Sequence, residues 1–309
     1  MAAATAAALV QAEAEGQGGH GLSRIPQYAG FLREGRADGA AHPRVIRQHG
    51  GTALIDAGNG LAFPALALAE AEALRRAPEH GVAFVAVTNS HHAGAMGLPV
   101  RRLAEAGLVA LAFTNSPYAM PVPGGRRPLL GTNPVAAALP RRGAPPLVID
   151  LALSEAARGK IMVAAKAGQP IPEGWALDAQ GQPTTDAAAA LDGAMLAMGG
   201  TKGAALALVV ELLCVALGGA AFGFEADSFF APSPRPPRLG HALLALDPGA
   251  LAGRDAFLDR IEVLVEAMLG EAGVRLPGSR RDALRAAAER DGLNIPAALL
   301  EQLHVLAGK

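Results

Sequence analysis

A glycine-rich segment near the N-terminus carries a histidine and an arginine that could perform acid–base chemistry on an anion. It runs Gly18-Gly19-His20-Gly21-Leu22-Ser23-Arg24. An imidazole titrates near neutral pH and can transfer a proton, and flanking glycines let a ligand come close. Arg24 can bind a carboxylate through both arms of its guanidinium. Taken alone, a histidine in such a segment is more often a surface-loop residue, so the chemical role needs support from the rest of the chain.

Polar residues also end several apolar runs that we expect to be buried strands. Residues 81–90 and 107–116 both end in Thr-Asn-Ser, and residues 98–106 form a helix between them. A third run, from Leu129, ends in Gly131-Thr132-Asn133-Pro134, and a fourth, from Pro146, ends in Asp150. The ends of buried strands are where α/β sheets usually place ligand sites. Asn, Ser and Gly are also ordinary strand terminators, so both interpretations stay open.

Two glycine-containing turns could hold a cofactor. Gly199 to Gly203 opens a long apolar helix, where backbone N–H groups and Lys202 could bind a phosphate, although the spacing is not that of a P-loop. A plain helix start explains the same residues equally well. Asn89 to Gly97 joins a strand to a helix, and its adjacent histidines point in different directions, so they do not predict a shared metal. No G-x-G-x-x-G follows a strand, so the Rossmann fingerprint is absent.

Composition narrows the class of partner. The 309 residues carry a net charge of -1, which gives no case for binding nucleic acid or an anionic membrane, so a small-molecule substrate is expected. Only 18% of residues are charged and 51% are hydrophobic, which favours a buried subunit interface. The single cysteine, Cys214, excludes an intrachain disulfide, and no Cys/His cluster predicts a metal. A reducing cytoplasm fits this cysteine usage.

The remaining chain alternates predicted helices and strands. We expect a helix to Ala14 without the basic start of a signal peptide, and one or two strands in residues 44–56. Residues 203–224 are long enough to cross a membrane, but Glu211 and a Gly-Gly pair interrupt them, so a buried core helix is predicted. Further predictions are helices over 63–77, 160–166, 255–269 and 280–291, a strand over 242–247 and an exposed proline-rich connection over 227–239.

These motifs, in order, resemble those of the malate/L-lactate dehydrogenase family, which also contains sulfolactate, ureidoglycolate and diketogulonate enzymes and cyclic-imine reductases. The resemblance runs from about Ala12 to the C-terminus. It is carried by His20 to Arg24, Asn89 to Gly97, Gly124-Gly125, Gly131 to Pro134, Ile149-Asp150, Arg158-Gly159-Lys160, Ile171 to Asp178, Pro183 to Asp186 and Gly199 to Gly203.

The resemblance implies an α/β fold that is not a Rossmann fold. A mostly antiparallel sheet flanked by helices would form the NAD(P)-binding domain, residues 79–239. Residues 1–78 and 240–309 would form a helical substrate and dimerisation domain, so a homodimer is expected. The implied activity is NAD- or NADP-dependent interconversion of a small 2-oxo acid and its 2-hydroxy acid, of malate, lactate or sulfolactate type.

The resemblance also implies roles for individual residues. His20 would be the general acid/base, and Lys160 a catalytic lysine that could hold a substrate carboxylate. Arg24, Thr132, Arg158 and Gly159 would contact substrate. Cofactor contacts would come from four segments: His92, Ala93, Gly94, Ala95 and Met96; Asp150, Leu151 and Ala152; Thr201 and Lys202; and Gly278, Ser279, Arg280 and Arg281.

Three departures from the family pattern bear on function. Gly19 replaces the usual serine, so a hydroxyl that would orient His20 is missing. Lys160 stands where cyclic-imine reductases carry an aspartate, which favours 2-oxo acids. The chain begins within the family's usual second helix, which puts the stability of the dimer in question. A cyclic ketimine reductase is the alternative enzyme, and a non-catalytic dinucleotide-binding member is the alternative of another class.

Overall fold

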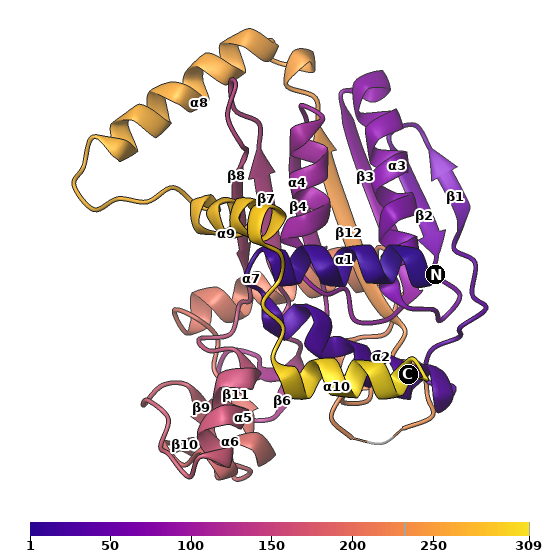
Figure 1. Cartoon of the computed structure of the whole chain (residues 1–309), viewed down its shortest axis with the longest axis vertical. Helices are drawn as coiled ribbons and strands as arrows, with labels where there is room; N and C mark the ends of the chain where they lie inside the picture. The colour runs from indigo at the N-terminus through magenta and orange to yellow at the C-terminus, as the bar shows by residue number, and fades with distance from the viewer. Residues whose placement is uncertain (232, 309) are drawn as a thin grey trace.

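A seven-stranded mixed sheet forms the centre of the molecule (Figure 1). The computed structural model describes residues 1–231 and 233–308. The strand order is β1-β2-β3-β12-β4-β7-β8, and every neighbouring pair is antiparallel except β2–β3. The strands span Arg44–His49, Thr52–Asp56, Val82–Ser90, Leu239–Leu246, Val109–Thr114, Val135–Leu139 and Leu147–Leu151 in that order.

The strand predictions hold, with one rearrangement in the middle of the sheet. Both Thr-Asn-Ser runs are buried strands, β3 and β4, and residues 44–56 form the β1–β2 hairpin. The predicted strand over 242–247 is β12, which lies between β3 and β4 and pairs with both. Strands from residues 1–78 and from 240–309 therefore share one sheet with strands of residues 79–239.

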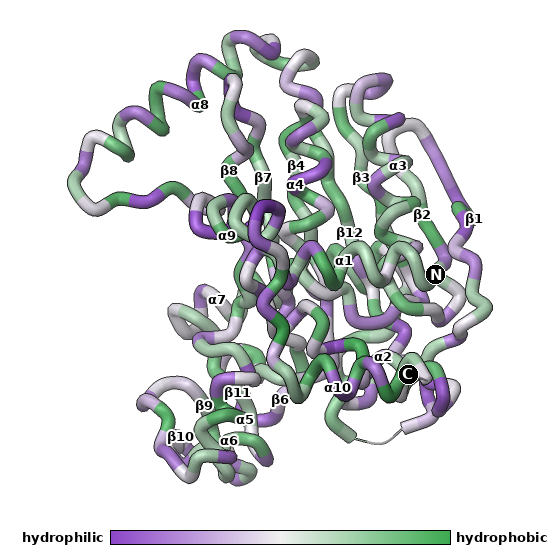
Figure 2. The backbone as a smooth tube through the Cα atoms, in the orientation of Figure 1, coloured by the Kyte–Doolittle hydropathy of each residue, from purple (hydrophilic) through white to green (hydrophobic). Residues whose placement is uncertain are grey.

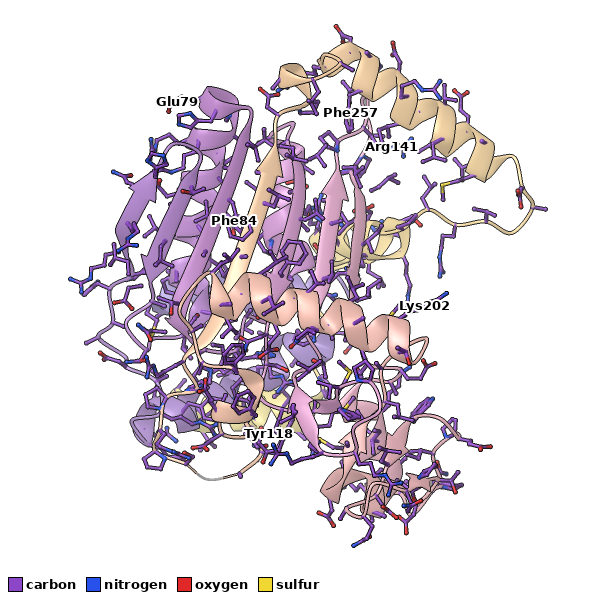
Figure 3. All side chains as sticks on the ribbon, turned by 180° about the vertical axis from the view of Figure 1, so that it is seen from behind. Glu79, Phe84, Tyr118, Arg141, Lys202 and Phe257 are labelled. Carbon is purple, nitrogen blue, oxygen red and sulfur yellow. The ribbon has the colours of Figure 1, made fainter. Side chains whose placement is uncertain are left out.

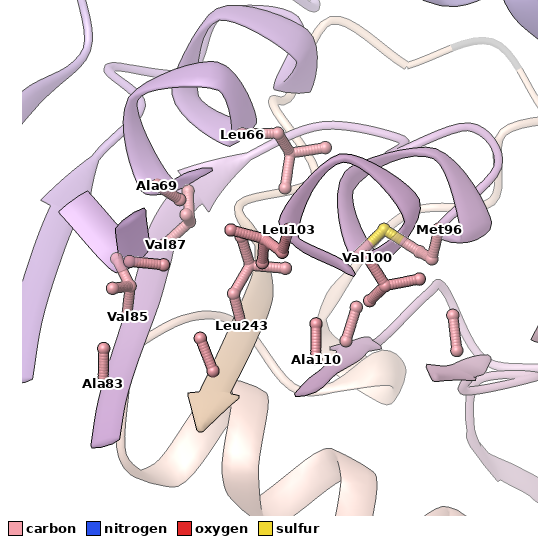
Figure 4. Close-up of a cluster of buried hydrophobic side chains, with 14 of the residues drawn as sticks. Leu66, Ala69, Ala83, Val85, Val87, Met96, Val100, Leu103, Ala110 and Leu243 are labelled. Atoms are coloured by element: carbon pink, nitrogen blue, oxygen red, sulfur yellow. The ribbon is translucent and has the colours of Figure 1, made fainter. Parts of the chain in front are cut away.

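Two helices cover one face of the sheet and enclose the largest core cluster (Figure 4). They are α3, Ala62–His80, and α4, Gly97–Glu105. Ala65, Ala69, Ala73 and Ala77 recur every four residues on α3 and are almost fully buried. Side chains that small let the α3 backbone lie close to the sheet, which explains why an alanine-rich sequence builds this layer.

The opposite face of the sheet is only partly covered (Figure 3). The long apolar run forms α7, Thr201–Glu211, and a π-helical turn, Leu212–Ala216. Its small residues pack on the sheet, but Leu206, Val209 and Leu212 are close to half exposed. The prediction of a buried core helix therefore holds for one face of this helix, because only that face has a protein layer against it. Within the described residues, no helix is both long and apolar enough to cross a membrane.

A small subdomain hangs below the main sheet (Figure 1). It contains a three-stranded sheet of β9, Ala176–Leu177, β10, Pro183–Thr184, and β11, Ala194–Met195. Two short helices, α5, Arg158–Lys166, and α6, Ala187–Asp192, pack against each other beside it. A separate hairpin of β5, Met120–Pro121, and β6, Pro128–Leu130, lies next to this subdomain.

The remaining helices lie outside the sheet layers. α1, Ala2–Ala14, α8, Arg254–Leu269, and α9, Ser279–Asp291, agree with the predicted helices. α2, Ile25–Arg33, is a further helix for which no element type was predicted. α10, Ala297–Leu306, was not predicted and packs on α2. α8 extends away from the body and alternates hydrophobic and hydrophilic residues along its length (Figure 2).

Candidate active site

The polar ends of the strands meet at one edge of the sheet, beside a cavity of about 580 Å³. β3 and β4 run in the same direction because each is antiparallel to β12, so both end at this edge. β8 ends there too, and β7 begins there, preceded by Thr132. The third predicted run, β6, belongs to the separate hairpin, yet the polar residues that follow it still reach the cavity.

Most of the predicted site residues line this cavity. They are His20, Arg24, His92, Ala93, Gly94, Ala95, Thr132, Asp150, Leu151, Ala152, Arg158 and Gly159. They come from the N-terminal segment, the ends of three strands and the start of α5. The fold therefore brings together residues that are far apart in the sequence.

The His20 loop is fixed by local hydrogen bonds. The chain leaves α1 at Gly16, whose φ of +73° suits glycine, and makes two short 3-10 turns, Gly18–His20 and Leu22–Arg24. The Leu22 amide donates to the Glu13 carboxylate at 2.8 Å, and the Ser23 hydroxyl donates to the Gly18 carbonyl at 2.6 Å. These bonds hold the imidazole at the cavity wall.

The surroundings of His20 disfavour its charged form. Burial lowers the pKa of His20, and the positive charge of Arg24 lowers it further, although Asp150 acts in the opposite direction. Its buried Nδ1 atom has no hydrogen-bond partner among the described residues. This agrees with the absence of a side-chain hydroxyl at position 19. His20 is thus a mainly neutral imidazole at neutral pH.

A second histidine and a tyrosine lie directly behind His20. The His92 ring stacks on the His20 ring, with centroids 5.5 Å apart and planes 16° apart. The Tyr28 hydroxyl lies 2.6 Å from His92 Nδ1. Burial raises the pKa of Tyr28 and holds the pKa of His92 well below its usual value, so a protonated phenol donates to a neutral imidazole. Tyr28 was missed because nothing in the sequence links it to His92.

Arg24 is held beside His20 by the same loop. Its Nε donates to the Gly19 carbonyl at 2.6 Å, and its Nη1 donates to the Gln27 side chain at 2.8 Å. A guanidinium fixed in this way loses little entropy when it binds an anion. Arg24 is therefore suited to hold a carboxylate next to the proton-transfer group.

Asp150 connects several of the predicted cofactor segments. Its Oδ2 accepts from the Gly97 amide at 3.0 Å, at the start of α4 directly after Met96, and from Gln17 Nε2 at 3.4 Å. Arg281 Nη1 lies 3.6 Å from the same oxygen. Three of the four segments expected to bind cofactor thus converge on one carboxylate.

The residues present fit an elongated cofactor with polar groups. Gln17 Oε1 and His20 Nδ1 are buried polar atoms without a hydrogen-bond partner in the described part of the chain, and both residues border the cavity. Gly94 has a φ of +70° and would place a Cβ 3.0 Å from the Phe63 ring, so only glycine fits this approach of the backbone. Unsatisfied polar atoms and a bare backbone are what a bound dinucleotide would use.

Several predicted residues do not border the cavity. Lys160 is exposed on α5, with its Nζ 5.9 Å from the centre of the Trp175 ring. Thr201 and Lys202 are exposed in the first turn of α7, and Met96 is buried in the core. Gly278, Ser279, Arg280 and Arg281 follow β8 along its outer edge, and only Arg281 of these contacts Asp150.

The proline-rich connection after residue 226 does more than link two elements. Arg36 is almost fully buried and donates to the carbonyls of Asp227, Ser228 and Ala231. This holds Phe229 against the His92 ring, at 5.5 Å between centroids, and places Ser228, Phe229 and Phe230 on the cavity wall. These residues were missed because aromatic side chains in a turn-rich segment give no sequence signal for a site.

Among the described residues, no group of three or more His, Cys, Asp or Glu side chains is arranged to hold a metal ion. Two of the histidines that gather here, His92 and His241, are instead held by side-chain hydrogen bonds. His241, for example, lies between Ser90 at 2.9 Å and Thr114 at 2.7 Å, and burial lowers its pKa to about 4. It ties β12 to β3 and β4 below the cavity floor.

Comparison with known proteins gives a consistent result. Residues 1–304 match the family model of malate/L-lactate dehydrogenase. The chain is 52% identical over 304 residues to (2R)-3-sulfolactate dehydrogenase (NADP(+)) of Chromohalobacter salexigens, covering 98% of this chain and 90% of that protein. It is 41% identical over 298 residues to the Δ1-pyrroline-2-carboxylate/Δ1-piperideine-2-carboxylate reductase of Pseudomonas putida, covering 96% and 87%.

Solved structures agree in fold. The Δ1-piperideine-2-carboxylate reductase of Pseudomonas syringae superposes with a TM-score of 0.91 at 40% identity, covering 97% of this chain and 90% of that one. The sulfolactate dehydrogenase of Methanocaldococcus jannaschii gives 0.90 at 32% identity, covering 99% and 89%. The chain therefore belongs to the malate/L-lactate dehydrogenase family of oxidoreductases.

Proposed function

We propose that this enzyme interconverts a small 2-oxo acid and its 2-hydroxy acid, with NAD or NADP as the hydride carrier. The observation that carries the proposal is His20, an imidazole of lowered pKa that shares one cavity with Arg24 and Arg158. The bound nicotinamide supplies or accepts the hydride. His20 donates a proton to the carbonyl oxygen during reduction and takes it back from the hydroxyl during oxidation.

The arginines set the class of substrate. Arg24 binds the carboxylate next to the reacting carbon, and Arg158, from a different element, meets a second anionic group. Arg158 is held by its bond to the Leu191 carbonyl at 3.0 Å and by the Phe230 ring, 5.3 Å from its guanidinium carbon. Two guanidinium groups favour a substrate with two anionic ends, such as malate or sulfolactate. Thr132, next to Ser116 at the cavity edge, is suited to contact the reacting group.

Roles outside the cavity stay as proposals of the family resemblance. We assign His92 to Ala95, Asp150 to Ala152 and Arg281 to the cofactor, because they line the cavity or hold Asp150. Thr201, Lys202 and Gly278 to Arg280 would meet the far end of a dinucleotide. Lys160 would have to swing from Trp175 to reach a substrate carboxylate, so the catalytic role of this residue has the least support in the geometry.

The comparisons also support an alternative activity, that of a cyclic ketimine reductase. The same proton from His20 would then go to the imine nitrogen, and Arg24 would bind the ring carboxylate. The Pseudomonas relatives named as pyrroline- and piperideine-2-carboxylate reductases support this possibility. Arg158 argues against it, since these cyclic imines carry only one carboxylate.

A substrate panel tests the proposal. Purified protein is assayed for oxidation of NADH and of NADPH with pyruvate, oxaloacetate, sulfopyruvate and Δ1-piperideine-2-carboxylate. We expect turnover of the two substrates with a second anionic group to exceed that of pyruvate. Turnover of the imine alone would replace the proposal with the ketimine reductase. Cofactor binding without any turnover would identify a non-catalytic family member.

We also propose that the enzyme is a cytoplasmic homodimer. Leu206, Val209 and Leu212 on α7 form an apolar surface that is close to half exposed in one chain. Leu264 and Leu269 on α8 are likewise 53% exposed. Contiguous apolar patches of this kind mark interfaces in soluble proteins. Sedimentation velocity is expected to give the mass of two chains, and a stable single chain at micromolar concentration would contradict the dimer.

A further inference from the structure

A second pocket adjoins the substrate cavity and contains arginines that the proposed reaction does not use. It has a volume of about 480 Å³ and lies between the β5–β6 hairpin and the small subdomain. Tyr118, Arg158 and Ser228 line both this pocket and the substrate cavity. In Figure 3, Tyr118 lies below α7 on this side of the molecule. A ligand in the substrate cavity can therefore extend into the second pocket.

The charge of the pocket is not balanced by ion pairs. Arg126 and Arg127 come from the hairpin turn and Arg158 from α5, and within the described part of the chain none of the three lies within 4.0 Å of a carboxylate. Three guanidinium groups without an ion pair around one pocket favour an anionic ligand.

Two carboxylates in the same pocket offset only part of this charge, because three guanidinium groups face two carboxylates. One oxygen of Asp178 accepts from the backbone amides of Gln180 and Gln182, each at 2.9 Å, which holds that carboxylate on its own turn. Asp192 is exposed to solvent at the end of α6. Its attraction only partly offsets the effect of burial, which lowers the pKa of Arg158.

Arg126 is positioned rather than free to swing. Gly181, with a φ of +75°, sits against its stem, and a Cβ at Gly181 would lie 2.5 Å from the Arg126 Cβ. Only glycine at the tip of the β9–β10 turn lets the hairpin and the small subdomain come this close. The contact aims the aliphatic stem of Arg126 along the pocket wall, so its guanidinium loses less entropy on binding.

We infer that this pocket is a second anion subsite, in which Arg126 and Arg127 bind an oxyanion carried on the far end of the substrate. The inference rests on the proposed function, because the substrate it describes occupies the same cavity. It extends the substrate class to 2-oxo acids whose distal carboxylate or sulfonate lies beyond the reach of Arg158 alone. The three shared wall residues are the path by which one molecule spans both hollows.

The test compares substrates of equal length with and without a distal charge. The double variant Arg126→Ala/Arg127→Ala is assayed with 2-oxoglutarate and 2-oxoadipate, and with 2-oxopentanoate and 2-oxohexanoate. Both arginines are exposed, so the fold is expected to persist. We expect KM for the two diacids to rise about tenfold and KM for the neutral acids to change less than about twofold, since charge-assisted contacts are lost only for the diacids. Equal changes for both sets would overturn the inference.

Two further arms separate this result from other causes. Arg47→Ala, an exposed arginine on the opposite edge strand of the sheet, is the matched control and should leave every KM unchanged. Inorganic phosphate should raise the apparent KM of the diacids only. If phosphate instead changed the kinetics of the neutral acids, and this change disappeared in the double variant, the pocket would be a site for a free anion and the inference would be overturned. Calorimetric binding of glutarate, weaker in the double variant, supports the subsite even if no oxo acid turns over, whereas equal binding would overturn it.

Discussion

The two sides of the cavity are built on opposite physical principles. On one side, which we call the histidine wall, the half-buried His20 and His92 rings stack on each other and the buried Tyr28 bonds to His92. On the other side, the half-buried Arg158 leads into the adjoining pocket, where Arg126 and Arg127 are exposed, and we call these three residues the arginine wall. Proton transfer needs a pKa that its surroundings control, and burial provides that control. Binding an anion needs only unpaired cations within reach of it.

The two walls also differ in how they are attached. The histidine wall joins the N-terminal segment to the main sheet, and Arg36 clamps the loop that covers it. The arginine wall belongs to a hairpin and a small subdomain with short strands and few elements. The proton transfer that we propose is thus placed beside the main sheet. The choice of substrate that we propose is placed on the hairpin and the small subdomain, which can change without disturbing the main sheet.

Replacing His20 has the largest expected effect, because it removes the group that makes the histidine wall reactive. His20→Asn keeps a polar side chain of similar size but cannot transfer a proton. We expect kcat to fall at least about hundredfold, with cofactor affinity nearly unchanged. Steady-state kinetics with NADPH, together with a fluorescence titration of the cofactor, measure the two effects separately. An unchanged kcat would show that His20 does not transfer the proton, and the histidine wall would then have no catalytic role to set against the arginine wall.

The pH profile of the unmodified enzyme sharpens the same prediction. Burial and Arg24 lower the pKa of His20 below 6.5. Oxidation needs the neutral imidazole, so its kcat/KM should rise with pH through that lowered pKa and be level at neutral pH. Reduction needs the protonated form, so its kcat/KM should fall as pH rises above the same pKa. Both pH dependences should be absent in His20→Asn, because asparagine does not titrate. A midpoint above 6.5 would show that the histidine wall stabilises the charged form.

The sequence predicts some residues of the site and misses others. His20, Arg24 and the strand ends at Asn89, Asn115 and Asp150 follow from local patterns, and their convergence follows from how buried strands align. Tyr28 and Phe229 could not be predicted, because each meets His92 across more than sixty residues of chain. His241 carries no sequence signal for a partner, and only the insertion of β12 between β3 and β4 reveals its hydrogen bonds. Local motifs can be recognised in the sequence, whereas contacts between side chains far apart in the chain cannot.

The overall architecture shows the same limit. Strand β12 and helix α8 were recognised as elements, but periodicity carries no information on which neighbours an element finds. The apolar run of α7 was expected to be a buried core helix, because hydrophobicity alone does not show which of its residues face the core. Half of that run is buried by this chain and half is left exposed.

The smallest expected effect concerns the unsatisfied imidazole nitrogen of His20. Among the described residues, its buried Nδ1 has no hydrogen-bond partner, and Gly19 stands where the family usually has serine. A Cβ added at Gly19 would meet no atom within 4 Å, so a serine fits there without displacing a neighbour. Gly19→Ser places a hydroxyl beside the imidazole, and one new hydrogen bond should raise kcat about twofold to tenfold.

Gly19→Ala separates the hydroxyl from the backbone. It adds the same Cβ and the same restriction of the unfolded chain but offers no hydrogen bond. If the alanine variant matched the serine variant in kcat, the gain would come from a stiffer loop, and the orphaned Nδ1 would have no catalytic cost. If only the serine variant raised kcat, the missing hydrogen bond at His20 Nδ1 would be shown to limit catalysis. Orientation of His20 in the present enzyme would then depend on the rest of its loop and on the stacked His92 ring.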